Sequence, residues 1–173
     1  MAFHMIAFLA IGLSVFAIVF AIRHLSGGRV AKWIMPAAAG AAMLGWSIWS
    51  EYAWSRTTAA GLPDGMEVAW ASEDRIGYRP WTMAFPVASR LIAVDRRAPL
   101  RHDAQPGVAI MPVIFAARWQ PTRTMNVAFD CNGHRRAEIG AGTTFAADGT
   151  LAGASWQPAE DADPIQTTAC QGG

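Results

Sequence analysis

Two stretches without Asp, Glu, Lys or Arg stand near the start of the chain and constrain its fold more than any other feature. Residues 5–22 read MIAFLAIGLSVFAIVFAI and residues 33–50 read WIMPAAAGAAMLGWSIWS, each 18 residues long. An α-helix rises 1.5 Å per residue, so each run spans roughly 27 Å, close to the ~30 Å hydrocarbon core of a bilayer. We therefore expect two transmembrane helices, at about residues 3–22 and 33–54.

A cleaved signal peptide and a buried hairpin of a soluble protein are the alternatives for these runs. A signal peptide needs positive charge before its apolar core and a small-residue cleavage site after it. Here the chain opens with MAFH, the cations follow the first run, and a second apolar run comes at once. This order of charges favours a retained two-helix hairpin.

The connection between the two runs carries only positive charge. Arg23, Arg29 and Lys32 lie in it, and all 13 acidic residues come after the second run. Short loops rich in Lys and Arg stay on the cytoplasmic side of a membrane. The sequence thus predicts a cytoplasmic loop, residence in a bacterial inner (cytoplasmic) membrane, and both termini in the periplasm.

Tryptophans gather at the ends of the second run. Amphipathic rings of this kind are enriched where a membrane meets water. We therefore expect four tryptophans to act as interface anchors and membrane lipids to be partners of the chain. The four residues are Trp33, Trp46, Trp49 and Trp54.

Small residues recur at helical spacing on both predicted helices and suggest how the helices meet. Faces of small residues let helix backbones approach closely and gain van der Waals contact. The alternative is that alanine is simply common in this chain. The predicted packing faces are Ala10, Ser14, Ala17 and Ala21 on the first helix and Ala37, Ala41 and Gly45 on the second, with surface left for another integral membrane subunit.

The rest of the chain predicts a linker at residues 55–65 and a periplasmic, antiparallel β-rich domain at residues 66–173. Strands are expected at residues 66–71, 90–95, 108–119 and 124–130, the last because apolar side chains alternate along it. Turns are expected at Asn132-Gly133 and Asp148-Gly149. Residues 98–107 read as a loop, and most of 72–89 has no clear pattern.

Asp163 followed by Pro164 predicts an N-cap with proline at the first helical position, so the chain is expected to close with a helical turn. The resulting fold class is a membrane α-helical hairpin with two transmembrane helices, joined to a small α+β periplasmic domain whose sheet is an antiparallel meander.

Cys131 and Cys170 are the two cysteines of the chain, and both fall in the segment assigned to the oxidising side. A disulfide is the expected pairing there. Chain-entropy reasoning gives about 4 kcal/mol for closing a loop of this length. Free thiols or metal ligands are the alternative, although no C-x-x-C or C-x-x-C-H pattern supports it.

The C-terminal third contains, in order, FDC (129–131), FAADG (145–149), SWQP (155–158) and DPIQTTAC (163–170). This order resembles the small disulfide-bonded β-domain of bacterial surface-adhesin protein E-like proteins. The resemblance implies a strand that bears a cysteine, a strand that ends in Asp-Gly, a strand with tryptophan, and a terminal helix whose cysteine bonds back. This chain departs from those adhesins because it carries two apolar runs and no lipoprotein cysteine near its start.

Few residues offer catalytic chemistry. The sequence has no G-x-S-x-G, no H-E-x-x-H and no glycine-rich phosphate loop. His102 in RHD and His134 before two arginines are the histidines available to an enzyme on the periplasmic side. Residues 51–173 hold 11 arginines and 13 acids, so a nucleic-acid partner is not expected. The expected sites therefore include no catalytic residue, no metal ligand and no cofactor.

Three functions are compatible with these features. The first is a non-catalytic accessory or structural subunit of a larger membrane complex of the respiratory, photosynthetic or secretion type. The second is a membrane-tethered periplasmic binding or adhesin-like module. The third is a hydrolase or redox enzyme, which would need a pocket that gathers His102 or His134 with acids. The sequence favours the first.

Overall fold

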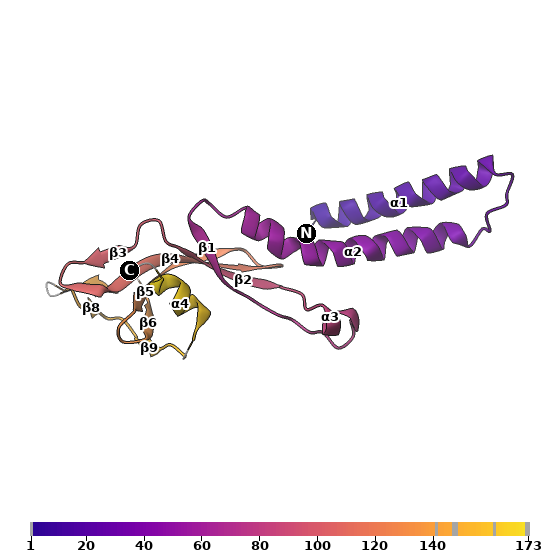
Figure 1. The fold of residues 1–173 in the computed structure, drawn as a ribbon. Helices are drawn as coiled ribbons and strands as arrows, with labels where there is room; N and C mark the ends of the chain where they lie inside the picture. The colour runs from indigo at the N-terminus through magenta and orange to yellow at the C-terminus, as the bar shows by residue number, and fades with distance from the viewer. Residues whose placement is uncertain (1, 141, 147–148, 161, 172–173) are drawn as a thin grey trace. The chain divides into compact units, whose positions relative to one another are not determined.

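The computed structural model describes residues 2–140, 142–146, 149–160 and 162–171. The chain divides into two compact units, Met1–Ala53 and Trp54–Gly173. The first unit contains helix α1 (Ala2–Leu25) and most of helix α2 (Ile34–Ala60), and the second contains a β-sheet domain (Figure 1).

The connection from α1 to α2 bends at two glycines that hold left-handed backbone. Gly27 and Gly28 have φ of 65° and 82°, values that glycine adopts without steric cost. The Ser26 hydroxyl donates to the Arg23 carbonyl at 3.1 Å, and the Arg23 guanidinium donates to the Val30 carbonyl. Ser26 thus satisfies a carbonyl near the end of α1, and Arg23 ties that end to the loop.

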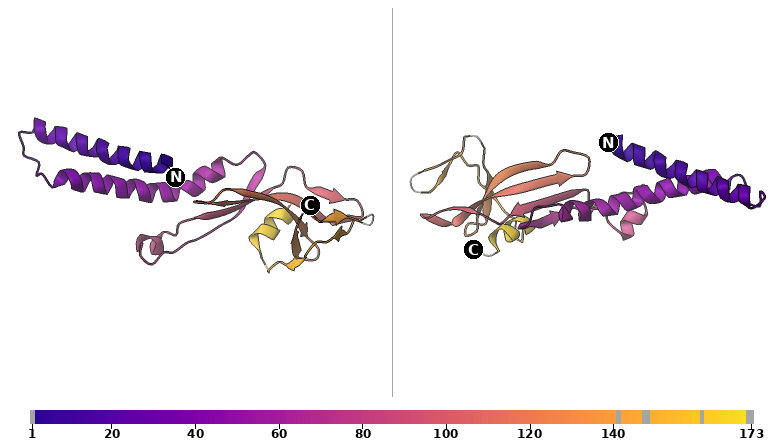
Figure 2. Two further views of the ribbon diagram at one scale, coloured as in Figure 1. Left: turned by 180° about the vertical axis from the view of Figure 1, so that it is seen from behind. Right: turned by 90° about the horizontal axis from the view of Figure 1, so that it is seen from above.

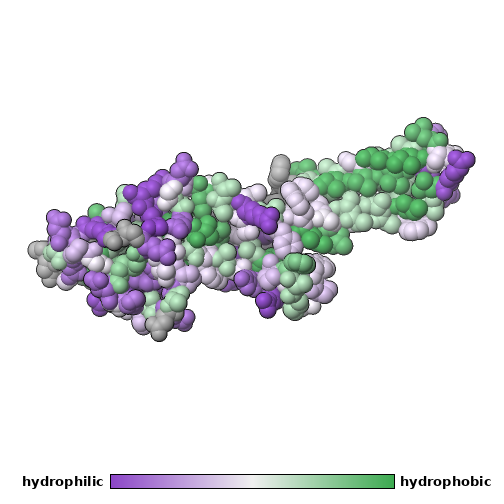
Figure 3. Space-filling model, in the orientation of Figure 1, coloured by the Kyte–Doolittle hydropathy of each residue, from purple (hydrophilic) through white to green (hydrophobic). Residues whose placement is uncertain are grey.

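Apolar side chains of α1 point outward rather than into a protein core. Within the described residues, the segment Met5–Leu25 is long and apolar enough to cross a membrane by length and composition, and only 6% of its most apolar window is buried. The helix α2 does not reach that level of hydropathy, because alanine, glycine and serine fill much of it. Figure 3 shows apolar surface along both helices and hydrophilic atoms at the loop that joins them.

Helix α2 is longer than the sequence predicts. It runs to Ala60 rather than ending near residue 54, so the first six residues of the segment predicted as a linker, 55–65, are helical. The physical reason is tertiary packing. Trp54, Ala59 and Leu62 lie against a buried cluster of the sheet domain, which rewards a continued helix there. That cluster consists of Leu91, Ala93 and Ala116.

The second unit is an antiparallel sheet in the order β1-β2-β4-β5-β6-β9, with β3 paired to β4 and a separate β7-β8 pair (Figure 2). The predicted antiparallel meander is present in β4, β5 and β6, because β4 pairs with β5 and β5 pairs with β6. The strands are β1 (Met66–Ala71), β2 (Arg90–Asp95), β3 (Leu100–His102), β4 (Gln105–Ala117), β5 (Arg123–Asp130), β6 (Arg135–Glu138), β7 (Thr144–Phe145), β8 (Leu151–Ala152) and β9 (Gln157–Pro158).

Each face of the sheet has its own core. Helix α4 (Pro164–Cys170) covers part of one face, where Ile165 and Ala169 pack beside Phe129. The other face carries the Leu91 cluster and receives the end of α2. The buried residues of the α4 face are Val94, Ala109, Met111, Val113, Val127, Phe129 and Ala169.

Two segments differ from the sequence-based expectation. Residues 98–107, expected as a loop, contain β3 and the start of β4, which pair with each other. Residues 72–89 fold as a long connection with a short helix, α3 (Trp81–Ala84). Asp148 of the predicted second turn lies outside the described residues, although Gly149 has the positive φ of 78° that such a turn needs.

Candidate functional site

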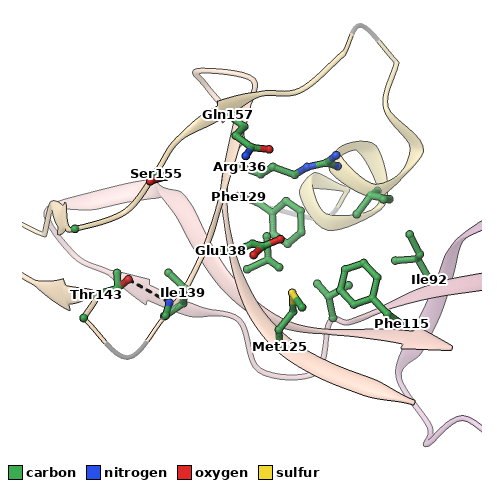
Figure 4. A pocket seen from close by; sticks show the side chains of 16 residues that line it. Ile92, Phe115, Met125, Phe129, Arg136, Glu138, Ile139, Thr143, Ser155 and Gln157 are labelled. Atoms are coloured by element: carbon green, nitrogen blue, oxygen red, sulfur yellow. Dashed lines mark hydrogen bonds between the residues drawn. The ribbon is translucent and has the colours of Figure 1, made fainter. Parts of the chain in front are cut away.

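A cavity of about 870 Å³ opens on the face of the sheet that α4 only partly covers. Its floor is apolar, and Ile92, Phe115 and Met125 lie around it with Phe129 (Figure 4). This volume lies within the range of small-molecule sites, which combine an apolar lining with a few polar groups. The further apolar lining residues are Val113, Val127, Ile139 and Ile165.

The pairing register of β5 and β6 explains why charged residues line this apolar space. Arg136 pairs with Phe129 and Glu138 pairs with Val127, and residues directly opposite in a ladder project to the same face. Thus β6 places one cation and one anion beside the apolar floor. Figure 4 shows both side chains at the cavity with Gln157 next to Arg136.

Asp163 joins this rim to the covering helix. Its Oδ2 accepts from the Arg136 guanidinium at 2.7 Å, and its Oδ1 accepts from the backbone N–H groups of Ile165 at 2.8 Å and Gln166 at 3.3 Å. The carboxylate therefore caps α4, as the sequence predicts, and also fixes the position of Arg136. In the sequence Arg136 is one of two adjacent arginines after His134, and that pattern gives no sign that its side chain lines a cavity.

Another side of the cavity is lined by described residues between Ile139 and Gln157. Thr143 Oγ1 accepts from the Gly140 N–H at 3.2 Å, as Figure 4 shows, and Ser155 faces the same space. Gly142 and Gly153 also line it, and Gly153 has a φ of 78°. A side chain added at Gly153 would stand 3.0 Å from the Gly142 carbonyl oxygen, so this wall depends on close backbone contact.

The predicted disulfide between Cys131 and Cys170 is present. It ties the end of β5 to the end of α4, with Cα atoms 5.7 Å apart. Gln166 strengthens the same junction, because its buried side-chain amide donates to the Asp130 carbonyl at 3.0 Å. Sequence reasoning missed Gln166, since a glutamine in a short polar helix gives no sign of burial.

The β5–β6 turn is held by a buried carboxylate. Asp130 Oδ1 accepts from the N–H groups of Asn132 at 3.1 Å and Gly133 at 2.8 Å, and Oδ2 accepts from Arg135 Nε at 2.8 Å. Burial alone would raise the pKa of Asp130, but the Gly133 N–H and the Arg135 guanidinium outweigh it and leave that pKa below the usual value. The predicted turn at Asn132-Gly133 is confirmed, although His134 takes the positive φ of 47°.

Neither histidine lines the large cavity. His102 lies on β3, where its Nδ1 accepts from the Ala104 N–H at 3.2 Å. His134 lies in the β5–β6 turn beside a smaller cavity of about 270 Å³ next to the disulfide. No group of three or more His, Cys, Asp or Glu side chains suited to a metal occurs in the part of the chain that the structure describes.

The residues of the predicted small-residue faces are all exposed in the structure. Gly12 of α1, by contrast, is buried and lies beside Met43 of α2. The helix phase explains the difference, because the residues that contact across the pair lie on another face from the alanine stripe. The seven exposed residues are Ala10, Ser14, Ala17, Ala21, Ala37, Ala41 and Gly45.

The four predicted interface tryptophans have different surroundings. Trp33 and Trp49 are exposed, and the rings of Trp46 and Trp49 stand 4.9 Å apart between centroids. Trp54 instead packs against the Leu91 cluster. In the described structure Trp54 therefore packs against the core of the sheet domain.

Comparison with protein families, curated proteins and solved structures finds no match for this chain. The similarity to the domain of surface-adhesin protein E-like proteins consequently stays a prediction. The candidate functional site is defined by its own geometry: an apolar cavity, a rim with Arg136, Glu138 and Gln157, and a covering helix fixed by a disulfide.

Proposed function

We propose that this chain is a non-catalytic integral protein of the bacterial inner membrane, an accessory or structural subunit of a larger membrane complex of the respiratory, photosynthetic or secretion type. In this proposal, residues 3–22 and 33–54 both cross the bilayer. The loop with Arg23, Arg29 and Lys32 is cytoplasmic, and the sheet domain and both termini are periplasmic.

The exposed apolar surface of α1 carries this proposal. Leu9, Leu13 and Ile18 are all exposed on a helix that has no acidic residue, an arrangement that is costly in water and favourable in lipid. The exposed alanine stripes on α1 and α2 leave close-packing surface for a second membrane subunit. The disulfide supports an oxidising compartment for the sheet domain.

Two measurements on the native protein test this proposal. Purification in mild detergent is expected to recover the chain together with other integral membrane proteins, and recovery as a monomer alone would contradict the subunit role. Labelling of a cysteine placed at Ser26 with a membrane-impermeant maleimide is expected only after the cytoplasmic face is opened. Labelling of this cysteine in intact spheroplasts would show that the loop faces the periplasm, which would contradict the proposed topology.

The cavity favours a second candidate function, a membrane-tethered binding module with no catalytic role. Residues 54–173 are the matching fragment, because Trp54 and Ala59 belong to the packing of the sheet domain. Native mass spectrometry of this fragment is expected to find a bound apolar molecule that Met125→Trp excludes by filling the cavity. If the fragment carries no ligand and Met125→Trp does not change the bound mass, the binding-module function is contradicted. The subunit role then remains as the proposed function.

A further inference from the structure

One end of the sheet domain presents apolar side chains that are more than half exposed. We name this surface the basic tip and define it as residues 75–90, the outer part of the β1–β2 connection, together with the β4–β5 turn at residues 118–123. Figures 1 and 2 show this connection projecting beyond β2 with α3 at its outer end. The exposed apolar side chains are Tyr78 (78% exposed), Met83 (55%), Phe85 (69%) and Trp119 (57%).

The basic tip contains five arginines and no Asp or Glu, and Glu73 and Asp74 lie directly before it in the sequence. Residues 75–94 and 104–129 contain no Asp or Glu. Asp74, at the base of the connection, is engaged there, because it accepts from the Ser72 hydroxyl at 3.0 Å and from the Ser89 hydroxyl. The five arginines of the tip are Arg75, Arg79, Arg90, Arg118 and Arg123.

Hydrogen bonds that are partly buried connect separate residues of the tip. Thr82 is fully buried, and its hydroxyl accepts from the Ile76 N–H at 2.8 Å and donates to the Arg79 carbonyl at 2.8 Å. Asp74 and Val87 exchange backbone hydrogen bonds of 2.9 and 3.1 Å across the connection. The apolar side chains are therefore presented outward by a preformed scaffold, not by a frayed loop.

The two parts of the tip are joined at their base. The Arg118 N–H donates to the Ser89 carbonyl at 2.9 Å, and Arg90 pairs with Ala117. Arginine side chains also lie over neighbouring aromatic rings, Arg79 at 5.2 Å from the Tyr78 centroid and Arg118 at 4.9 Å from that of Trp119. Figure 3 shows hydrophobic and hydrophilic atoms side by side around α3.

The sheet end that carries the tip is also the end that receives α2. Leu91 directly follows Arg90, and Ala116 comes just before the turn with Arg118, and both belong to the cluster against which Trp54 packs. Trp54 is the last residue of the second proposed membrane segment. If that segment spans the bilayer, the chain itself brings this end of the domain to the membrane–water interface.

We propose that the basic tip binds the surface of the membrane that holds α1, with Tyr78, Met83, Phe85 and Trp119 inserted among the headgroups of anionic phospholipids. This proposal rests on the proposed membrane anchor. Tyrosine and tryptophan are enriched at membrane interfaces, apolar groups with cationic neighbours bind anionic lipid surfaces, and guanidinium groups pair with phosphate in a fork geometry. A protein partner for this surface would be expected to offer acidic side chains instead.

The test places a coumarin amino acid at one position at a time in the full chain, reconstituted in phosphatidylcholine vesicles with and without phosphatidylglycerol. Met83 reports on the tip, Leu100 is an exposed control on β3, and Leu13 reports on α1. The quencher for Met83 and Leu100 is a phospholipid with a nitroxide near its headgroup, and the quencher for Leu13, which lies near the middle of the proposed span 3–22, is a phospholipid with a nitroxide near the end of its acyl chain. In vesicles with phosphatidylglycerol we expect quenching at Met83 about threefold or more above that at Leu100.

The outcomes separate this proposal from the proposed function. Quenching at Leu13 with equal, weak signals at Met83 and Leu100 overturns the lipid-binding tip and leaves the anchor. Quenching at Met83 without quenching at Leu13 supports the tip and overturns the anchor, and absence of quenching at both overturns both.

A charge variant gives an independent readout with a matched control. Arg75→Gln together with Arg123→Gln is expected to lower the quenching at Met83 in vesicles with phosphatidylglycerol, whereas Arg101→Gln on β3 is expected to leave it unchanged. Slower backbone hydrogen exchange at residues 76–86 of the unmodified chain in these vesicles than in detergent gives the same conclusion without a substitution. Equal effects of the two charge variants, or equal exchange in vesicles and detergent, would overturn the proposal.

Discussion

Arg136 donates to the Asp163 carboxylate at 2.7 Å while the other oxygen of that carboxylate caps α4. One side chain thus connects the rim of the cavity on β6 to the helix that covers the sheet. The pair is partly exposed, so its strength comes from this shared role more than from Coulomb attraction alone.

Substitution of Asp163 separates the cap from the ion pair. Asp163→Asn keeps a good N-cap and weakens the contact with Arg136, whereas Asp163→Ala removes both. We expect Asp163→Ala to lower the free energy of unfolding by about 1–2 kcal/mol, and Asp163→Asn to cost less than half of that. Urea unfolding of residues 54–173 followed by tryptophan fluorescence measures both. Equal costs for the two variants would show that the cap contributes nothing.

Removal of the disulfide is expected to cost about 4 kcal/mol of unfolding free energy, because the bond closes a loop with a sequence separation of 39 residues. The double variant Cys131→Ala with Cys170→Ala avoids free thiols, and urea unfolding with and without reductant measures the effect. Reductant should destabilise the native protein and leave the double variant unchanged. If reductant does not change the unfolding free energy of the native protein, the disulfide does not contribute the expected stability.

Acid should destabilise the sheet domain through its buried carboxylates. Asp130 has a lowered pKa, because the Gly133 N–H and Arg135 outweigh the effect of burial, and the Arg97 side chain lowers the pKa of Asp95. A carboxyl with a lower pKa in the folded state binds protons less tightly than in the unfolded state. Its stabilisation is therefore present above about pH 4 and is lost as the pH falls through the folded-state pKa.

This pH dependence is checked by the urea midpoint measured from pH 7 down to pH 2.5. The midpoint should be nearly constant down to about pH 4 and fall below it. Asp130→Asn should cost about 2 kcal/mol at pH 7, since it loses charge-assisted hydrogen bonds, and should flatten the fall at low pH. A variant profile parallel to that of the native protein would contradict the assignment to Asp130.

Two methionines in opposite environments give a matched test of the core. Met111 is 1% exposed in the core below α4, and Met83 is 55% exposed on α3. Met111→Ala should cost about 2–5 kcal/mol because it leaves a cavity, whereas Met83→Ala should stay within about 0.5 kcal/mol. Urea unfolding compares them. A large cost for Met83→Ala would mean that α3 supports the folded state.

The elements with a simple period could be predicted from the sequence. β1 and β2 have the expected bounds, β5 follows its alternation of apolar residues, and Asp163-Pro164 marks the start of α4. These signals are local, because they depend on the period of side chains and on capping chemistry near one position. The two cysteines could be paired because no other cysteine competes.

The remaining features depend on contacts between distant residues. β3 lacks an apolar period and forms because the long β4 offers an edge to pair with. The extra turns of α2 exist because Trp54 and Ala59 find the Leu91 cluster. The cavity rim could not be predicted either, since the register of β5 against β6 decides that Arg136 and Glu138 face the apolar floor.

The helix that completes the core follows every strand it covers in the order of synthesis. A nascent chain that ends before residue 165 therefore lacks Ile165 and Ala169, which pack beside Phe129, and it also lacks Cys170, the disulfide partner of Cys131. The apolar face with Met111 and Phe129 can be completed only after the last residues of α4 have been made.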